Sequence, residues 1–368
     1  MRKLKSMKIY NVHIHTFTHR AVPEGFLPLK MAHFIKTPWI TKKIGFILHY
    51  LFPFSDNDIF DRYAKYLIAG DKKNQMHVFE NILRFYPEGS AFGVLSMDMH
   101  HMGAKEVPQP FEKQLEKLAK VKEKYPDQVY PFIFVDPRRK NIFELVKKYI
   151  EDHDFAGIKM YPSVGYFPTD KRLYPIYEYA EKNQIPITVH CSRGGVHYHG
   201  EITDEMLEPC KLKIPDISGF DQRKKCNLFS HPSNYRYVLD DFPELKLNFG
   251  HFGGQTDWED KIYNPKKEIN DIFDINWVEE ITQIIAKYKN AYTDISFTLH
   301  NSKFYPLLKI FLENPELKEK ILFGSDYYMV YFNKREKRYG LDIRGALGED
   351  HFFQIANKNP KKFLQTKL

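Results

Sequence analysis

Cysteine is scarce in this chain, and its scarcity excludes one class of protein. The 368 residues include three cysteines, Cys191, Cys210 and Cys226. An odd and sparse set cannot build the disulfide framework of a small secreted domain, and it suits a reducing compartment. Residues 1–8 are basic but run directly into an apolar segment, without the apolar core and cleavage site of a signal peptide. We therefore expect a cytoplasmic protein.

Long hydrophobic runs and blocks of one charge sign are absent as well. The best candidate for a membrane span, residues 33–54, contains Lys36, Lys42, Lys43 and two prolines, whereas a spanning helix needs about 20 apolar residues. The net charge of +8 comes from lysines scattered through segments with helical periodicity, and not from a basic arm. We therefore predict a small-molecule substrate, with neither nucleic acid nor a membrane as a partner.

What the chain does contain is a regular alternation of two patterns. Eight apolar runs are predicted as strands, at residues 8–15, 90–99, 129–135, 156–161, 187–191, 246–251, 291–296 and 321–325. Segments with helical periodicity separate them, at residues 111–124, 142–150, 173–183, 234–241, 277–288 and 305–312, and the tail at 341–363 is also predicted as helical. This alternation indicates an α/β fold with a parallel sheet, and eight strands are the number that closes a (β/α)₈ TIM barrel.

A glycine-rich phosphate turn is missing, which counts against the main alternative fold. An open, doubly wound sheet usually carries such a turn after its first strand, whereas here the first strand ends in histidines. The chain also shows neither an internal repeat nor a low-complexity linker. Length alone would allow two domains, but barrels routinely exceed about 200 residues. We therefore predict a single barrel domain over residues 1–368.

Two long segments interrupt the alternation. Residues 17–89, after the first strand, show helical periodicity around 59–69 and 76–85 and are predicted as a helical insertion. Residues 192–245 are predicted as a long loop after the fifth strand. Both would leave the barrel from its active-site face, where such loops set specificity. Aromatic residues early in the insertion, among them Phe34 and Trp39, suit a lid or a contact in a homo-oligomer.

Two histidines end the first predicted strand. Successive side chains of a strand point to opposite faces, so His13 and His15 are expected to point the same way and could reach one metal ion. Histidines two apart in a strand also occur by chance, so this pair alone leaves a metal site and an ordinary strand equally open.

Ionisable residues stand at the ends of most of the other predicted strands. They are Asp98, His100 and His101, then Lys159, His190, His251, Asp294 and Asp326. In a barrel of this type the active site lies at the carboxyl ends of the strands. Imidazole and carboxylate ligands with an open position suit a catalytic zinc or a similar divalent ion. The sequence therefore predicts a metal site at this end of the barrel.

Six short motifs carry a resemblance to a known family. They are HIH at residues 13–15, GIKMYP at 157–162, HCSRGG at 190–195, GHFGG at 250–254, LFGSD at 322–326 and IANKNP at 355–360. In this order and spacing the chain resembles the amidohydrolase superfamily, in the branch that includes aminocarboxymuconate-semialdehyde decarboxylase. The resemblance covers nearly the whole chain, except the two long segments, and it implies a metal-dependent enzyme.

The resemblance also implies roles for the strand-end residues. His13, His15 and His190 would be metal ligands, and Asp326 would both bind the metal and accept a proton from the attacking water. His251 would act as an acid or base, or would bind a second metal as in binuclear relatives. The expected cofactor is a divalent metal, with zinc as the first choice and one or two ions per chain.

Lys159 decides between one ion and two. In binuclear relatives a lysine at the end of the fourth strand is carboxylated and bridges two metals. The alternative is an unmodified lysine that neutralises a buried carboxylate or binds an anionic substrate. Asp294 is expected to orient a ligand histidine or to pair with Lys159.

Three further residues are predicted to bind substrate. Arg193, close after His190, suits bidentate binding of a substrate carboxylate, but it could equally pair with a loop acid. His100 lies near the expected mouth of the barrel. Tyr327, directly after Asp326, is expected to line the pocket.

Three functional hypotheses follow. The first is a hydrolase in which a metal-activated water attacks the carbonyl carbon of an amide, lactone or ester in a small, anionic substrate. The alternative uses the same site for non-oxidative decarboxylation of an unsaturated or aromatic carboxylic acid, with Arg193 orienting the acid and His251 or Asp326 moving protons. The third, a catalytically dead barrel used as a scaffold, is disfavoured because the expected ligand positions are all filled.

Overall fold

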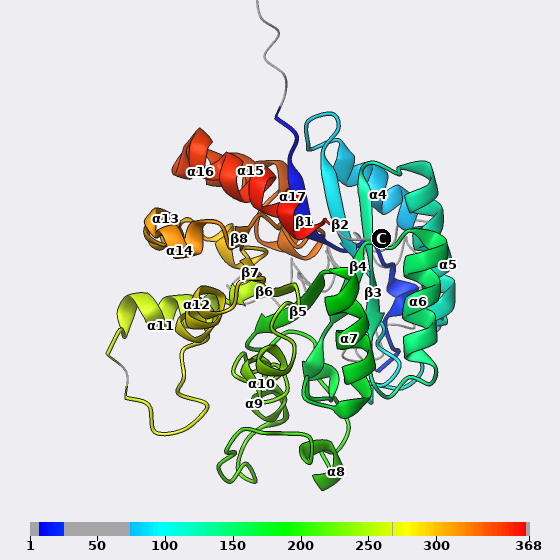
Figure 1. Cartoon of the computed structure of the whole chain (residues 1–368), viewed down its shortest axis with the longest axis vertical. Coiled ribbons are helices and arrows are strands. Elements are labelled where there is room, and N and C mark those ends of the chain that lie inside the picture. The colour runs from blue at the N-terminus through cyan, green and yellow to red at the C-terminus, as the bar shows by residue number, and fades with distance from the viewer. Residues whose placement is uncertain (1–6, 26–73, 267, 366–368) are drawn as a thin grey trace, which may run out of the picture.

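The chain folds as the predicted barrel. The computed structural model describes residues 7–25, 74–266 and 268–365 (Figure 1). Eight parallel strands form one sheet in sequential order. They are β1 (Tyr10–Ile14), β2 (Ala91–Leu95), β3 (Val129–Val135), β4 (Gly157–Met160), β5 (Ile187–Ser192), β6 (Leu247–Gly253), β7 (Ala291–Asp294) and β8 (Ile321–Leu322).

The sheet closes on itself between its first strand and the segment after its last. Val12 N donates to Phe323 O at 3.0 Å, and Asp326 N donates to His13 O at 2.8 Å. Ile14 also forms a parallel bridge with Tyr327. The closure brings the end of β1 beside the turn that follows β8, although the two lie at opposite ends of the sequence.

Helices connect the strands and surround the sheet (Figure 1). The longer ones are α4 (Gln75–Leu83), α5 (Phe111–Lys124), α6 (Ile142–His153), α7 (Tyr174–Asn183), α10 (Asn234–Asp241), α11 (Gln255–Tyr263), α12 (Trp277–Lys287), α13 (Tyr305–Glu313) and α15 (Glu336–Leu347). Shorter ones are α8 (Asp204–Leu207), α9 (Gln222–Asn227), α14 (Pro315–Lys318), α16 (Glu349–Phe353) and α17 (Asn359–Phe363). In α5 the residues at helical spacing, Leu115, Leu118 and Val121, are fully buried, as an amphipathic helix requires.

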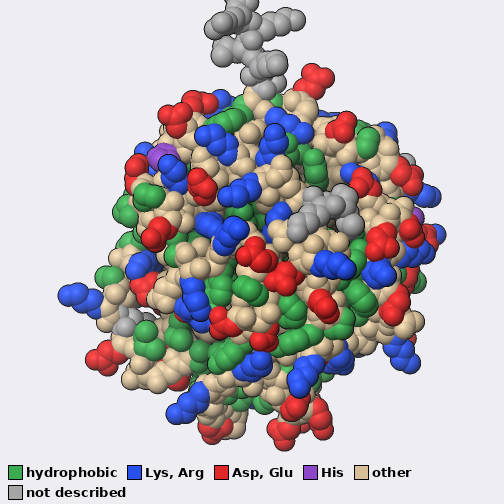
Figure 2. Space-filling view, viewed as in Figure 1, with side chains coloured by type: hydrophobic (Ala, Val, Ile, Leu, Met, Phe, Trp, Pro, Cys, Tyr) green, Lys and Arg blue, Asp and Glu red, His purple; other side chains and the backbone are tan. Residues whose placement is uncertain are grey.

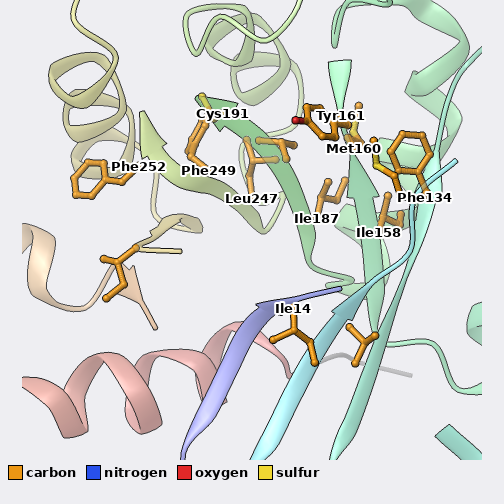
Figure 3. Packing of buried hydrophobic residues seen from close by; sticks show 14 of the residues in the cluster. Ile14, Phe134, Ile158, Met160, Tyr161, Ile187, Cys191, Leu247, Phe249 and Phe252 are labelled. Atoms are coloured by element: carbon orange, nitrogen blue, oxygen red, sulfur yellow. The ribbon is translucent and has the colours of Figure 1, made fainter. Parts of the chain in front are cut away.

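Apolar side chains fill the space between the sheet and its helices. Figure 3 shows part of this main cluster, with Ile158, Ile187 and Leu247 on three neighbouring strands. A smaller cluster joins Val12 and Leu322 to residues of β2, β3 and β7. Close-packed layers of this kind hold the strand ends in fixed positions. The polar residues at those ends are therefore held in fixed positions as well.

The two long segments are described in part. Most of the predicted insertion at 17–89, including the helix expected at 59–69 and the aromatic residues Phe34 and Trp39, lies outside the described residues. Its last part contains α4, close to the helix predicted at 76–85. The segment predicted as a long loop at 192–245 carries α8, α9 and α10. The polar, acidic stretch at 256–274 contains α11, which the sequence pattern did not predict.

The charged side chains are mixed on the face of the molecule shown in Figure 2, where lysine and arginine alternate with aspartate and glutamate. Among the residues that the structure describes, none of the helices combines the length and the hydropathy needed to cross a bilayer.

Candidate metal centre

Three residues from the end of β1 and from the turn after β8 meet at one point. His15 Nε2 lies 3.4 Å from Asp326 Oδ1, and His13 Nε2 lies 3.8 Å from the same oxygen. All three residues are buried. One potential ligand atom from each lies within 4.8 Å of the other two. Imidazole nitrogens and a carboxylate oxygen at such separations are a donor set suited to a divalent cation.

The backbone explains why Asp326 reaches the histidines. Its amide donates to His13 O at 2.8 Å, and His15 N donates to Tyr327 O at 2.6 Å, so the turn after β8 is bonded to the end of β1 on both sides of the carboxylate. Asp326 has a φ of 60°, a left-handed conformation that aspartate tolerates better than most residues. Gly324 allows the close approach, because a Cβ there would lie 2.8 Å from the Cβ of His13.

Hydrogen bonds to the other ring nitrogen orient both histidines. His15 Nδ1 lies 3.0 Å from the carbonyl oxygen of Leu95, and His13 Nδ1 lies 3.0 Å from Asp294 Oδ2. A carbonyl oxygen only accepts, so Nδ1 of His15 carries the proton and its Nε2 lone pair faces Asp326. Burial lowers the pKa of both imidazoles, which keeps them in the neutral form that binds metals.

His190 and His251 extend the cluster. The His251 ring centroid lies 4.7 Å from that of His13 and 4.7 Å from that of His190. His190 stacks on Tyr161 with centroids 3.8 Å apart, and its Nε2 lies 3.1 Å from Ser192 Oγ. Burial lowers the pKa of His251 to about 3, so it is a neutral base at pH 7. The four predicted histidines therefore form one series of ring contacts, but His190 belongs to neither group of potential ligand atoms that lie within 4.8 Å of one another.

Asp294 orients the cluster, as one of its two predicted roles required. Its carboxylate receives hydrogen bonds from Asn248 Nδ2 at 2.8 Å, from the amides of His251 and Ser296 at 3.1 and 3.0 Å, and from the Ser296 hydroxyl. With these donors and His13, the pKa of Asp294 is held below its ordinary value in spite of burial. His13, His251 and Asp294 also form a group of potential ligands, but here the carboxylate is already saturated with donors.

Lys159 is buried beside these carboxylates. Burial lowers the pKa of its ammonium group to about 8, and the charges of Asp294 and Asp326 oppose that shift. Its Nζ lies 5.7 Å from the ring centroid of Tyr161. A largely protonated lysine at neutral pH therefore places a positive charge within the cluster.

Two atoms of the cluster lack hydrogen-bond partners. His13 Nε2 and Asp326 Oδ1 are buried, and neither has a partner. Burial raises the pKa of Asp326 well above its ordinary value, with Lys159 opposing the shift and Asp294 adding to it. Leaving such groups unpaired is costly, and a cation between them would satisfy both. The residues present therefore fit a divalent cation.

Arg193 takes the second of its two predicted roles. Its Nε donates to Asp257 Oδ2 at 2.9 Å, its Nη2 donates to the carbonyl of Ile275 at 2.7 Å, and the guanidinium lies 4.9 Å from the Trp277 ring centroid. These contacts join the turn after β5 to α11 and α12. The guanidinium is thus engaged by an acid in α11, and not by one in a loop, and by a backbone carbonyl.

The other two residues predicted to bind substrate, His100 and Tyr327, also have contacts within the protein. His100 is exposed, and its amide donates to Asp98, whose carboxylate pairs with Arg139 at 2.6 Å. Tyr327 is buried, and its hydroxyl accepts a hydrogen bond from Asn81 at 2.7 Å. Binding of substrate by His100 or Tyr327 stays a prediction.

Some residues of the cluster were not singled out from the sequence. Ser296 Oγ lies 3.0 Å from Nδ1 of both His13 and His251, and Asn248 bonds Asp294. Asn248 precedes the predicted site residue His251 by three positions, so strand alternation would have placed it on the opposite face of β6, and no signal in the sequence identified it. Ser296 follows β7 in an irregular segment, where no such periodicity applies.

His231, which lies near Arg193 and outside the cluster, gives a prediction about pH. Burial, reinforced by the charge of Arg193, lowers its pKa to about 3 from an ordinary value of 6.5. Between these values the unfolded chain binds a proton that the native ring does not, so the free energy of unfolding falls as the pH falls. We expect His231→Gln to flatten this dependence in urea denaturation between about pH 6.5 and about pH 4. An unchanged slope in the variant would contradict the assignment.

The comparisons with known proteins bear on the whole chain. The sequence model of a family described as "Amidohydrolase" matches residues 77–366. A search of curated proteins gave no match. Among solved structures, 5-carboxyvanillate decarboxylase from Novosphingobium aromaticivorans, with bound manganese and 3-methoxy-4-hydroxy-5-nitrobenzoic acid, has a TM-score of 0.57 at 11% identity, over 97% of each chain.

Two other solved structures share the fold. 4-Oxalomesaconate hydratase from Rhodopseudomonas palustris has a TM-score of 0.52 at 15% identity, over 97% of this chain and 95% of that one. A probable 2-pyrone-4,6-dicarboxylic acid hydrolase from Acinetobacter baumannii, with bound citric acid, has a TM-score of 0.54 at 11% identity, over 97% of this chain and 99% of that one. At these identities the likeness confirms the barrel fold.

Proposed function

Because the chain belongs to the amidohydrolase family and is an enzyme of that superfamily, we propose that it is a metal-dependent hydrolase acting on a carbonyl carbon of a small, anionic substrate. One observation carries the proposal. His13 Nε2 and Asp326 Oδ1 are buried without partners and face each other at 3.8 Å, so the site has a place for a cation and a carboxylate beside it.

His13, His15 and Asp326 would hold the cation, with His190 completing the set. Zinc is the metal we propose, because imidazole with one carboxylate is its usual ligand set at catalytic sites. Manganese is the competing choice, since the decarboxylase with the same fold contains it. A bound divalent cation lowers the pKa of a coordinated water to about 7 and so supplies a nucleophile near neutral pH.

The protein's own groups would move the protons. We propose that Asp326 accepts the proton of the attacking water on its other carboxylate oxygen, since its Oδ1 would be engaged by the cation. His251 is neutral, and its Nδ1 lies 3.2 Å from the carbonyl of Ser296, which fixes the proton on Nδ1 and leaves Nε2 as a base. We propose that His251 then carries a proton to or from the leaving group.

We propose that Lys159, and not Arg193, supplies the positive charge that favours binding of an anionic substrate. The guanidinium of Arg193 is engaged by Asp257 and Ile275, whereas Lys159 places a positive charge among the site carboxylates. We propose that Lys159 is unmodified and that the site holds one cation. Its charge offsets that of Asp294 and Asp326 and favours binding of a substrate anion.

Decarboxylation is the second candidate function. The decarboxylase with the same fold was crystallised with an aromatic acid and manganese, and a second decarboxylase, acting on 2,6-dihydroxybenzoate, has a TM-score of 0.50. Against it, the route in which Arg193 orients the carboxylate conflicts with the contacts of that side chain. In this chemistry water is not consumed, whereas hydrolysis adds its oxygen to the product.

The source of oxygen in the product therefore distinguishes the two reactions. We expect turnover of a member of an amide, lactone and ester panel in ¹⁸O-enriched water to place ¹⁸O in the acid product, with no release of CO₂, as measured by mass spectrometry. Release of CO₂ from hydroxybenzoates, with no product from the first panel, would establish the decarboxylase. Full metal occupancy without turnover on either panel would revive the scaffold hypothesis. A cytoplasmic location and a homo-oligomer remain predictions that these assays do not address.

A further inference from the structure

A buried polar cluster lies behind the candidate metal centre and shares no side chain with it. It consists of Asn11 in β1, Tyr86 after α4, Ser325 before Asp326, and Glu336 at the start of α15. Tyr86 Oη donates to Glu336 Oε1 at 2.5 Å, and Asn11 Nδ2 donates to Tyr86 Oη at 2.8 Å. The cluster thus joins four segments that are far apart in the sequence.

Burying Glu336 at this position costs free energy, because its carboxyl group is incompletely hydrogen-bonded. Its side chain is 2% exposed, its Oε2 has no hydrogen-bond partner, and none of the described lysines or arginines forms an ion pair with it. Burial raises its pKa to about 7. Apolar side chains of similar size at such buried positions often leave the fold equally stable or more stable. We therefore infer that the carboxyl group of Glu336 has a function beyond packing.

The contacts of the cluster lead to the backbone of the candidate ligands. Asn11 Oδ1 accepts from Ser325 N at 3.1 Å and from His13 N at 3.3 Å, and Asn11 Nδ2 donates to Ser325 Oγ at 2.8 Å. Ser325 Oγ also accepts from Tyr327 N at 3.2 Å. The residues on both sides of Asp326 are therefore bonded to the cluster, as is the amide of His13.

The segment from Gln75 to Tyr86, which contains α4, also contacts the chain neighbours of two candidate ligands. Asn81 in α4 donates to the hydroxyl of Tyr327 at 2.7 Å. Thr16, directly after His15, donates its hydroxyl to Gln75 Oε1 at the start of α4 at 2.9 Å. The segment from Gln75 to Tyr86 thus reaches the turn after β1 and the turn after β8.

We propose that Glu336 and Tyr86 are positioning residues, which hold Asp326 at the distance from His13 and His15 that a bound divalent cation requires. The proposal rests on the metal site proposed above. Asn11 and Ser325 transmit the constraint, because each bonds to both the cluster and the backbone of a ligand turn. Neither positioning residue touches the cation or the substrate. A polar cluster suits this task because hydrogen bonds are directional, whereas apolar contacts would allow the turn to shift.

Two variants that remove the hydrogen bond between Tyr86 and Glu336 test the proposal, Tyr86→Phe and Glu336→Met. Protein stripped by a chelator is titrated with Co²⁺, whose visible absorption reports the coordination geometry, and with Zn²⁺ in competition. We expect each variant to bind these ions about 10- to 100-fold more weakly and to show an altered Co²⁺ spectrum. The double variant should lose no more affinity than the worse single variant, because both residues act through one hydrogen bond.

Tyr177→Phe is the matched control. Tyr177 is fully buried on α7, a helix that carries none of the candidate ligands, and its hydroxyl donates to the carbonyl of Pro168 at 2.8 Å. We expect this variant to lose thermal stability comparably and to keep the affinity and spectrum of the original protein. If Tyr86→Phe and Glu336→Met behave like the control, the positioning role is wrong while the metal site stands. If the unaltered protein binds neither ion, the proposed function fails and the inference fails with it.

Discussion

Replacing Asp326 by asparagine is expected to lower kcat by about 10²- to 10⁴-fold, the range seen when a proton-accepting group is removed. Asparagine keeps the shape of the side chain and one oxygen, but it has neither the negative charge nor the ability to take a proton. The change also removes an anionic partner for a cation beside His13 and His15, which lie 3.8 and 3.4 Å from Oδ1. The measurement is steady-state kinetics together with metal content per chain.

The control for this variant is Asp170→Asn. Asp170 is also buried and forms a bidentate pair with Arg172, but that pair lies at the N-terminus of a short helical turn before α7. We expect it to change stability and to leave kcat near its original value. A variant of Asp326 that retains full activity with full metal content would show that another group accepts the proton, and His251 would be the next residue to test.

The barrel could be predicted from the sequence because its evidence is local and repeated. The segments at 129–135 and 111–124 match β3 and α5 in both bounds, since an apolar run and a helical period each have clear edges there. Strand ends in the site were less predictable. The run at 321–325 forms a strand over Ile321–Leu322 alone, because the amide of Phe323 donates to Ile355 O, outside the sheet, at 2.8 Å.

The candidate ligands could be recognised because each ends a strand, and parallel strands in a barrel end on one face. The sequence could not show which hydrogen-bond partners each side chain has in the folded protein. For Arg193, close after His190, the sequence left substrate binding and pairing with an acid equally open, and Asp257 engages it from a distant segment. The same holds for Glu336, whose hydrogen-bond partners are Asn11 in β1 and Tyr86, three residues after the end of α4. Such contacts depend on tertiary structure, and no local pattern encodes them.

The sheet register near the histidines also departs from the ideal strand. The pairing of β1 with β2 shifts between Asn11 and Ile14. Strict alternation would put Asn11 on the same side as His13, but its amide instead bonds Tyr86 and Ser325 in the cluster behind the site. An irregular register lets one short strand supply both a candidate ligand and the anchor that holds the opposite turn.

Removing divalent cations is expected to abolish turnover and to lower the melting temperature by roughly 5 °C or more, with both restored by adding metal back. The reason is the pair of buried atoms without partners, His13 Nε2 and Asp326 Oδ1, which a cation would satisfy. A ligand present at about 100 to 1,000 times its Kd stabilises the folded state by about 2.7 to 4.1 kcal/mol. The measurements are activity, metal analysis and thermal unfolding, each with and without a chelator.

Three variants sharpen this experiment. His13→Ala should lose the effect of the chelator, because its cation is already gone, whereas His351→Ala, which alters a histidine paired with Glu313 away from the site, should keep it. Lys159→Met tests the number of ions, and one equivalent per chain should remain in it. Two equivalents in the original protein that are lost together in this variant would show a carboxylated, bridging lysine. The burial of Lys159 beside Asp294 and Asp326 favours the single ion, because an unmodified ammonium already supplies the charge that a second cation would bring.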